Sequence, residues 1–397
     1  MIVQFTVKNF LSFKEKTTLD MTSINAYKEH ANNLIDINEK DRILRVAAIY
    51  GANASGKSNL YKAIRSFQII IAESLNNVDD SNTQVITKYY KPFSFNKNKD
   101  NTEFEIIMIY DKVEYKYGFE YNKEHIVSEW LYKKRIDYNR NTIVFEREND
   151  KIEFGASFRK ECDTYKEQIP SETLVLSFFN KLKLKTDVFS VVYKNINNII
   201  VAKTGMFEKR SVIEKILPDI IDTEKKQFLK FLNAIDTGIK DISYEQNDDN
   251  TRFYTTHHDE LGNAYNIDLS SESEGTIKSI AIYIYAELAI ITNRCMFVDE
   301  LNIKLHPLLL KFIIDLFYNQ SSEAQLIYTT HDTTLLDKKF FRRDQIWFVQ
   351  KDNVGRSELF ALSDFKVRAD ASFEKDYLAG VYGGIPLIKD FEMREGE

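Results

Sequence analysis

The chain has 397 residues, 43% of them hydrophobic and 29% charged, and a formal net charge of −6. This length exceeds one ordinary core and predicts a large domain with a sizeable second lobe, in a soluble globular protein. The negative net charge gives no overall attraction to nucleic acid. It does not exclude a local basic groove, for which there are two candidate clusters, Lys133-Lys134-Arg135 and Lys181, Lys183 and Lys185.

Membrane and export signals are not found in the sequence. The longest nearly apolar run, residues 280–291, is too short to span a bilayer and contains Glu287, and no charged-then-apolar leader opens the chain. Cys162 and Cys295 have no metal-like spacing and indicate a reducing compartment. We therefore predict a cytoplasmic protein without membrane contact.

The first elements surround a phosphate-binding pattern. Alternating residues at 2–9 predict a half-buried strand, the apolar run 46–50 predicts a buried strand, and residues 59–67 have the apolar spacing of a helix. Between the last two lies GANASGKS, residues 51–58, which fits G-x-x-x-x-G-K-[ST] without mismatch.

Each residue type in this loop has a mechanical reason to be there. Glycines allow turns in which successive N–H groups surround a phosphate, and the following helix adds its dipole. Lys57 places a charge near the β- and γ-phosphate oxygens, and the Ser58 hydroxyl can ligate Mg²⁺. The predicted phosphate-binding residues are Gly51, Asn53, Ala54, Ser55, Gly56, Lys57, Ser58 and Asn59.

The rest of the chain changes its pattern twice. Alternation at 103–110 and 113–121, around the pair Asp111-Lys112, predicts a hairpin in an antiparallel region. Residues 158–240 take helical spacing without sustained heptads. Strand pattern returns near 252, and then a helix near 275–292, a strand at 295–299, a helix near 307–318 and a strand at 325–330 predict a parallel sheet that includes the loop strand. Residues 345–349 predict a further strand.

Further motifs lie on these later elements. The strand 295–299 ends in two acids, of which Asp299 can hold Mg²⁺ through water and Glu300 can polarise an attacking water. Ser273-Glu274-Gly275 opens the long helix and fits either an anion site or a simple N-cap. His331 ends the strand 325–330; alone it would be structural, but after the other motifs it fits a γ-phosphate sensor. Pro307 suits a first helical turn.

The order of these motifs resembles that of ABC-type ATPase heads. The opening FTVKNFLSF, residues 5–13, resembles the first strand of the SMC, RecF and OLD group. Further segments are similar to the RloA-like ATPases of bacterial abortive-infection and phage-defence systems: PFSF at 92–95, EWLY at 129–132, FER at 145–147, SEGT at 273–276, DELNIKLHP at 299–307, THD at 330–332 and YLAGVYGGIP at 377–386.

The resemblance implies a fold and a division of the chain. The fold is α/β, an ABC-type P-loop ATPase head with an antiparallel β subdomain and an inserted helical lobe. Residues 1–155 would form the N-terminal half of the head with the phosphate loop and the β subdomain, 156–245 the inserted helical lobe, and 246–397 the C-terminal half with the signature, the Walker B strand and the strand-end His.

The resemblance also implies a mechanism with ATP and Mg²⁺ as cofactors. Two heads would sandwich two ATP molecules, with Ser273 and Gly275 of one copy against the γ-phosphate held by the other. Catalytic residues would be Glu300, His331 and Lys57, and the metal ligands Ser58 and Asp299. His306 takes the place of the D-loop Asp of many transporters, as it does in the RloA-like group. Other positions depart from the family patterns: Glu274 stands where the common signature has Gly, Asn302 and Lys304 replace an Asp and a small residue, and Leu11 stands where an Arg is frequent. An acid at 274 would repel the γ-phosphate and slow hydrolysis.

The motifs and the resemblance are compatible with three functions. The leading hypothesis is an ATP-binding and hydrolysing switch of an anti-phage system, a homodimer of heads or a larger assembly. A separate effector protein is expected because no Asp-x-Asp pair of a two-metal nuclease follows His331. The alternatives are a RecF- or SMC-like DNA-maintenance ATPase that binds DNA, and a scaffold that binds ATP without turnover.

Some residues keep more than one interpretation. Gln68 and Gln84 are both candidates for the glutamine that ends the first β region in many ABC heads. Phe10 or Phe13 could border the adenine, although aromatic residues in strands more commonly pack in a core. The adjacent pair His257-His258 points to opposite faces of a strand and is not expected to bind a metal.

Overall fold

The computed structural model describes residues 1–76, 84–96, 100–138, 140–203, 210–235, 237–247, 250–303, 305–318, 322–368 and 371–385. Lys304 and Pro386, which belong to the motifs above, lie outside these residues. Among the described helices, none combines the length and the apolar character that crossing a bilayer requires.

A six-stranded sheet carries the phosphate loop. Its order is β11-β15-β16-β5-β17-β18, and all neighbouring pairs are parallel except β17 with β18. The strands are β11 (Ile200–Lys203), β15 (Cys295–Asp299), β16 (Gln325–Thr329), β5 (Val46–Tyr50), β17 (Ile346–Lys351) and β18 (Ser357–Ala361). The predicted parallel sheet is confirmed, but β11 lies inside the segment for which only helices were predicted.

A second, seven-stranded sheet is antiparallel throughout, as predicted. Its order is β10-β9-β8-β7-β6-β1-β2. The strands are β10 (Lys151–Phe154), β9 (Thr142–Glu148), β8 (Ile126–Arg135), β7 (Val113–Tyr121), β6 (Thr102–Tyr110), β1 (Ile2–Lys8) and β2 (Thr17–Asp20). Asp111 and Lys112 join β6 to β7 with φ of 47° and 58°, the left-handed pair that a tight hairpin requires.

Helix α1 (Lys57–Glu73) lies between the two sheets. The parallel strands are buried on both faces, which explains their continuous apolar runs. Ala47 and Ile49 of β5 share a core with α1 and the antiparallel sheet, whereas Val46, Ala48 and Tyr50 face a second core. That second core includes residues of α7 (Glu274–Ile291), α8 (Pro307–Tyr318) and α9 (Phe373–Leu378).

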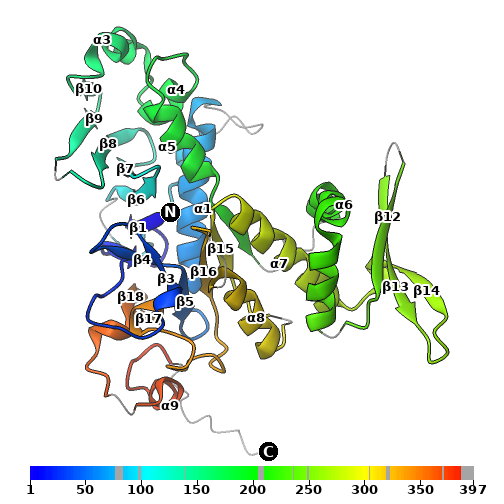
Figure 1. Cartoon of the computed structure of the whole chain (residues 1–397). Helices are drawn as coiled ribbons and strands as arrows, with labels where there is room; N and C mark the ends of the chain where they lie inside the picture. Colours follow the sequence, from blue (N-terminus) through cyan, green and yellow to red (C-terminus); the bar gives the residue numbers. More distant parts are fainter. Residues whose placement is uncertain are drawn as a thin grey trace, which may run out of the picture.

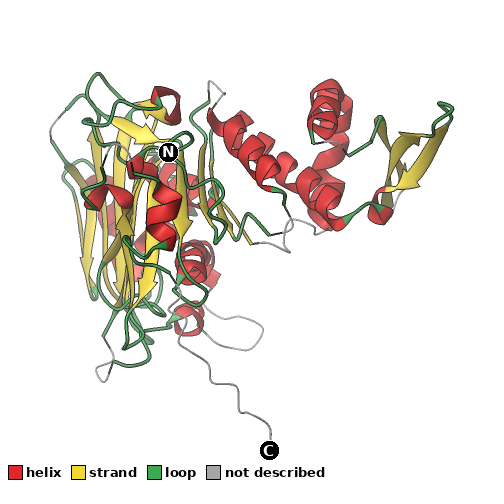
Figure 2. Cartoon of the chain, turned by 90° about the horizontal axis from the view of Figure 1, so that it is seen from below, coloured by secondary structure: helices red, strands yellow, loops and turns green. Residues whose placement is uncertain are grey.

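An arm projects from this body in both views (Figures 1 and 2). It comprises α6 (Arg210–Ala234), whose residue Glu224 has non-helical φ and ψ, and the sheet of β12 (Asp241–Asn247), β13 (Asn250–His258) and β14 (Ala264–Asp268). Helix α7 contacts α6 in the arm and β15 in the body. By contrast, α4 (Val175–Asn180) and α5 (Val188–Asn197) pack in the first core. The segment 156–245 therefore contributes to both cores, and the three-part division of the chain stays a proposal.

Two of the family motifs place a buried acid and a buried base on facing strands. Glu129 and Arg147 lie opposite each other on β8 and β9 and are 0% and 2% exposed. Glu129 accepts hydrogen bonds from Tyr117 and from the N–H groups of Val175 and Leu176, while Arg147 donates to the carbonyls of Asn149, Pro170, Ser171 and Thr173. These motifs therefore fasten the segment leading into α4 onto the antiparallel sheet.

The buried carboxyl of Glu129 is expected to make the stability of the protein depend on pH. Burial raises the pKa of its carboxyl from 4.5 to about 7, although the N–H of Leu176 and the charge of Arg147 oppose the shift. Because the folded-state pKa is raised, the Glu129 carboxyl makes its full contribution to stability below pH 4.5, and this contribution is lost as the pH rises through about 7. The free energy of unfolding changes by about 3 kcal/mol over this range. Glu129→Gln is expected to flatten the free energy of unfolding between pH 5 and about 8, measured by urea denaturation.

The control for that change is Glu148→Gln, at an exposed acid of the same sheet. Glutamine cannot replace every hydrogen bond of the carboxylate, so Glu129→Gln also lowers the free energy of unfolding itself. The comparison therefore uses the slope of the free energy of unfolding against pH and not its absolute value. An equal slope in wild type and Glu129→Gln would contradict the assignment.

Candidate nucleotide site

The phosphate loop runs from the end of β5 into α1. Gly56 has a φ of 122°, and a Cβ there would overlap Ser357 Oγ, so this position requires glycine. Lys57 is 7% exposed and donates to the carbonyl oxygens of Gly51 and Ala52 at 2.7 and 3.0 Å. The ammonium group is thus held by carbonyl oxygens of its own loop.

One buried hydroxyl of the loop fits a phosphate oxygen. Ser55 is 4% exposed, and among the described residues its Oγ has no hydrogen-bond partner. Buried hydroxyls are rarely left in this state, because desolvation without a partner is costly. The residues present therefore fit an anionic group with hydrogen-bond acceptors. Asn53 and Ala54 are exposed at the tip of the loop, and Ser58 is half-buried at the start of α1.

Asn59, predicted to bind the nucleotide, has its side chain in a hydrogen bond within the protein. Its Nδ2 donates to Ser12 Oγ at 2.7 Å, and Ser357 Oγ donates to the Ser55 carbonyl oxygen while it lies 2.7 Å from Ser12 Oγ. This hydroxyl cluster holds the loop against the start of the chain and β18. Whether Asn59 contacts a nucleotide stays a prediction.

The acid-ended strand lies two strands away from the loop in the sheet. Asp299 is fully buried at the end of β15, and its Oδ1 accepts a hydrogen bond from Thr329 Oγ1 at 2.7 Å. Glu300 follows with a φ of 58°. Burial lowers the pKa of Lys57, while the nearby charges of Asp299 and Glu300 oppose that shift. Lysine and both acids therefore share one electrostatic environment.

His331 follows β16, the strand between β15 and β5, and is exposed. Its Nε2 lies 3.4 Å from Asn302 Nδ2. Asn302 is 9% exposed, and in the described part of the chain its Oδ1 is buried without a hydrogen-bond partner. Since parallel strands end at one edge, Gly51–Ser58, Asp299, Glu300 and His331 gather there.

The helix start at Ser273 lies elsewhere, on the arm side of α7 (Figure 1). Ser273 Oγ accepts the N–H of Thr276 at 3.1 Å, so the N-cap interpretation is present in this state. Ser273 and Glu274 are exposed and Gly275 is half-exposed. The preceding Glu272 is anchored on β13, because Thr255 Oγ1 donates to its Oε1 and His257 Nε2 lies 2.7 Å from that oxygen.

The predicted position His306 and the buried Lys278, which was not predicted, both have clear local roles. His306 Nδ1 accepts the N–H of Leu308 at the start of α8, which begins at Pro307 as predicted. Lys278 of α7 is fully buried and donates to the carbonyls of Leu301 and Ile303, which ties the signature helix to the segment after Glu300.

Two of the open interpretations are not supported by the structure. Gln68 is buried within α1 and donates to the carbonyls of Ile196 and Ile199, so it joins α1 to the end of α5 instead of reaching the loop. Phe10 and Phe13 are both 0% exposed in the first core and cannot border an adenine. Gln84 precedes α2 (Val85–Tyr89) and is half-buried.

Sequence reasoning missed the contact between the C-terminal segment and the loop. The Ala52 N–H donates to the Gly384 carbonyl at 2.7 Å, and Tyr377 OH donates to the same oxygen at 3.0 Å. Gly383 and Gly384 have φ of 69° and 70°, so the glycine doublet was an available signal for a turn, although its partner was not.

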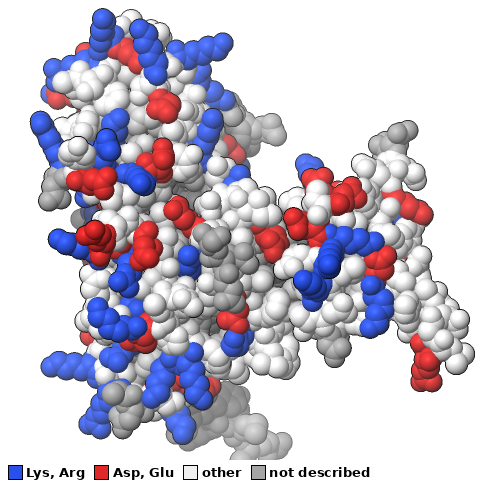
Figure 3. Space-filling view, in the orientation of Figure 1, with Lys and Arg blue, Asp and Glu red and all other residues white. Residues whose placement is uncertain are grey.

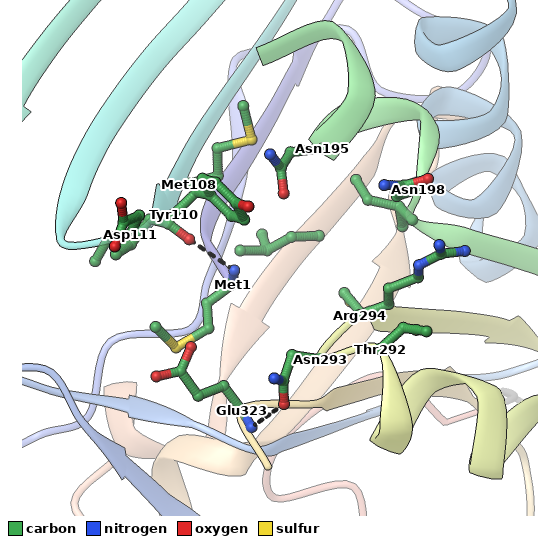
Figure 4. Close-up of a pocket in the computed structure, with 14 residues that line it drawn as sticks. Met1, Met108, Tyr110, Asp111, Asn195, Asn198, Thr292, Asn293, Arg294 and Glu323 are labelled. Atoms are coloured by element: carbon green, nitrogen blue, oxygen red, sulfur yellow. Dashed lines mark hydrogen bonds between the residues drawn. The ribbon is translucent and has the colours of Figure 1, made fainter. Parts of the chain in front are cut away.

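A separate cavity of about 440 Å³ lies at the other edge of the parallel sheet (Figure 4). Its lining includes Met1, Asn198, Arg294, Cys295 and Glu323. Arg294 and Cys295 lie at the amino end of β15, Glu323 precedes β16, and Asn198 precedes β11. The cavity is therefore distinct from the edge that holds Glu300 and His331.

The basic clusters are not isolated from acids. Lys134 pairs with Glu114 at 3.5 Å, and Lys133 lies over the Phe158 ring. Lys181, Lys183 and Lys185 are exposed after α4. Figure 3 shows basic side chains near α3 (Arg159–Cys162) alongside acidic ones. Within the described ranges, no group of three or more His, Cys, Asp and Glu is placed so that it could hold a metal ion.

A parallel sheet with a phosphate loop, an acid-ended strand and a histidine at one edge, joined to an antiparallel sheet, is the arrangement of a P-loop ATPase domain. A family model described as "AAA domain, putative AbiEii toxin, Type IV TA system" matches residues 46–337, and the chain belongs to this family. No curated protein gives a match to the chain.

Solved structures similar to the chain include SMC heads at low identity. An SmcHead bound to the C-winged helix domain of ScpA is 15% identical with a TM-score of 0.46, covering 95% of this chain and 99% of that one. The SMC head domain from Thermotoga maritima is 13% identical with a TM-score of 0.45, covering 91% and 98%. The Smc head domain with an extended coiled coil, bound to the C-terminal domain of ScpA derived from Pyrococcus furiosus, is 13% identical with a TM-score of 0.41, covering 96% and 99%.

Proposed function

We propose that this chain binds and hydrolyses ATP as a dimeric switch of a bacterial anti-phage, abortive-infection system, and that its ATP state controls a separate effector protein. The observation that carries the ATPase part is the convergence of Lys57, Asp299, Glu300 and His331 at one edge of the parallel sheet. The family match and the motif resemblance support the defence role.

The residues at this edge have complementary roles. The loop N–H groups, Lys57 and Ser55 bind the phosphates, and Ser58 with Asp299 holds Mg²⁺, which neutralises charge on the phosphate oxygens when bound. Glu300 takes a proton from the attacking water. His331 contacts the γ-phosphate region, and Asn302 beside it offers a buried carbonyl oxygen to a donor there.

The second copy supplies the other face of the site. Ser273 and Gly275 lie on the arm side of α7, while the loop lies at the edge of the sheet in the body. An exposed serine at the N-terminus of a long helix suits the γ-phosphate of an ATP held by a partner copy. Glu274 in the same turn opposes that anion, so turnover is slow.

The test has two parts. The purified chain with ATP and Mg²⁺ is expected to release phosphate slowly and to shift toward a dimer on a sizing column with light scattering. A tagged chain expressed with its neighbouring gene is expected to co-purify with that gene's product. Absence of turnover would remove the enzymatic part, and a lone chain that is fully active as an effector would remove the partner.

A further inference from the structure

Thr329 lies at the junction of the strands that carry the site. It is the last residue of β16, is 0% exposed, and pairs with Ile49 at the end of the phosphate-loop strand β5. On its other side is β15, which ends at Asp299. Its side chain and backbone therefore sit between the loop strand and the acidic residues.

The Thr329 hydroxyl makes two hydrogen bonds in opposite directions. It donates to Asp299 Oδ1 at 2.7 Å, and its oxygen accepts the backbone N–H of Glu300 at 2.8 Å. A hydroxyl can do both at once, because it has one hydrogen and two lone pairs. One side-chain atom thus contacts both predicted functional acids.

The hydrogen bond from the Glu300 N–H to Thr329 Oγ1 stabilises a strained backbone conformation at Glu300. Glu300 has a φ of 58°, a left-handed conformation that is unfavourable for a residue with a long side chain. The Glu300 N–H to Thr329 Oγ1 and the Leu301 N–H to the Thr329 carbonyl oxygen, at 3.1 Å, hold the chain on both sides of this conformation. The direction in which the Glu300 side chain leaves the strand depends on it.

The neighbouring residue ties the same point to the phosphate loop. The Thr330 N–H donates to the Ile49 carbonyl oxygen at 2.9 Å, two residues before Gly51. The end of β16 therefore fixes the acidic residues relative to the loop that would hold the phosphates.

We propose that Thr329 is a positioning residue for hydrolysis: its hydroxyl orients the Asp299 carboxylate toward the metal and holds Glu300 in the geometry that activates water. This inference rests on the proposed ATPase function. It assigns Thr329 no contact with the nucleotide, so it separates turnover from nucleotide binding.

The test compares Thr329→Val, which removes the hydroxyl at nearly constant shape, with Thr329→Ser, which keeps it. Partners that orient metal ligands typically change metal affinity or activity by about 10–100-fold when mutated. Thr329→Val is expected to lower kcat and to raise the Mg²⁺ concentration for half-maximal turnover within that range. Affinity for a non-hydrolysable ATP analogue should stay within about threefold, and Thr329→Ser should recover kcat to within about threefold of wild type.

Thr102→Val is the matched control, because Thr102 is also 0% exposed and loses one hydroxyl bond, to the Asn9 carbonyl oxygen in the antiparallel sheet. It should leave kcat per nucleotide-binding site unchanged. If Thr329→Val does not fold, Thr329→Ala provides the same comparison with Thr329→Ser.

Three outcomes decide the matter. Turnover of Thr329→Val close to wild type, or a Thr329→Ser variant as impaired as Thr329→Val, would overturn the role of Thr329 alone. A wild-type chain that binds ATP without turnover would overturn the ATPase proposal and this inference with it.

Discussion

Glu300→Gln is expected to slow ATP turnover by about 10²-fold or more, while ATP affinity changes little. Glutamine keeps the size of the side chain and the left-handed backbone at position 300 but cannot accept a proton from water. The effect should therefore appear in kcat and not in the dissociation constant of the nucleotide. Single-turnover phosphate release and equilibrium binding of a fluorescent ATP analogue measure the two quantities separately.

The same variant should accumulate as an ATP-held dimer, because hydrolysis reopens the pair in the proposed cycle. Glu323→Gln provides the control, since Glu323 is an exposed acid before β16, at the opposite edge of the parallel sheet. Turnover of Glu300→Gln equal to that of wild type would exclude Glu300 as the general base.

Lys57→Ala is expected to weaken ATP binding by about 100-fold or more, because the phosphate oxygens lose the positive charge and the hydrogen bonds of a buried ammonium group. The change also removes the donor to the Gly51 and Ala52 carbonyl oxygens, so the loop itself loses support. Isothermal titration with ATP and Mg²⁺ measures the affinity, and a melting curve in the absence of nucleotide measures the cost to the fold.

Lys62→Ala is the matched control, because Lys62 lies on the same helix but is exposed. It should leave affinity and melting temperature close to wild type. Comparable ATP affinity in Lys57→Ala and Lys62→Ala would show that the loop does not bind phosphate in the proposed way.

Local patterns were sufficient to predict most of the fold. The GKS loop with its strand and helix, the hairpin at Asp111-Lys112, α7, α8 and the acid-ended strand β15 were all predicted, because each has a clear period or turn chemistry within a few residues. One element that was not predicted is β11, whose four residues between helices are too few to show a period.

The predicted site residues at the sheet edge lie together because the ends of parallel strands coincide. Contacts that depend on strand order or on distant segments could not be predicted in this way. Thr329 reaches Asp299 only because β16 lies beside β15, and the Gly384 carbonyl reaches Ala52 from more than 300 residues away along the chain. Gln68 was misleading, because a buried glutamine in a helix bonding distant carbonyls has no signature in one sequence.

The central claim is that one copy completes the site of the other, and cross-linking tests it most directly. The exposed positions Asn53 and Ser273 are changed to cysteine in separate Glu300→Gln chains, which are mixed with ATP and Mg²⁺ and treated with a short bismaleimide. The two native cysteines, Cys162 and Cys295, are buried, which limits background reaction. We predict a covalent dimer that forms only in the mixture and only with ATP. Cross-linking within a single chain that carries both cysteines, with no covalent dimer in the mixture, would contradict the account.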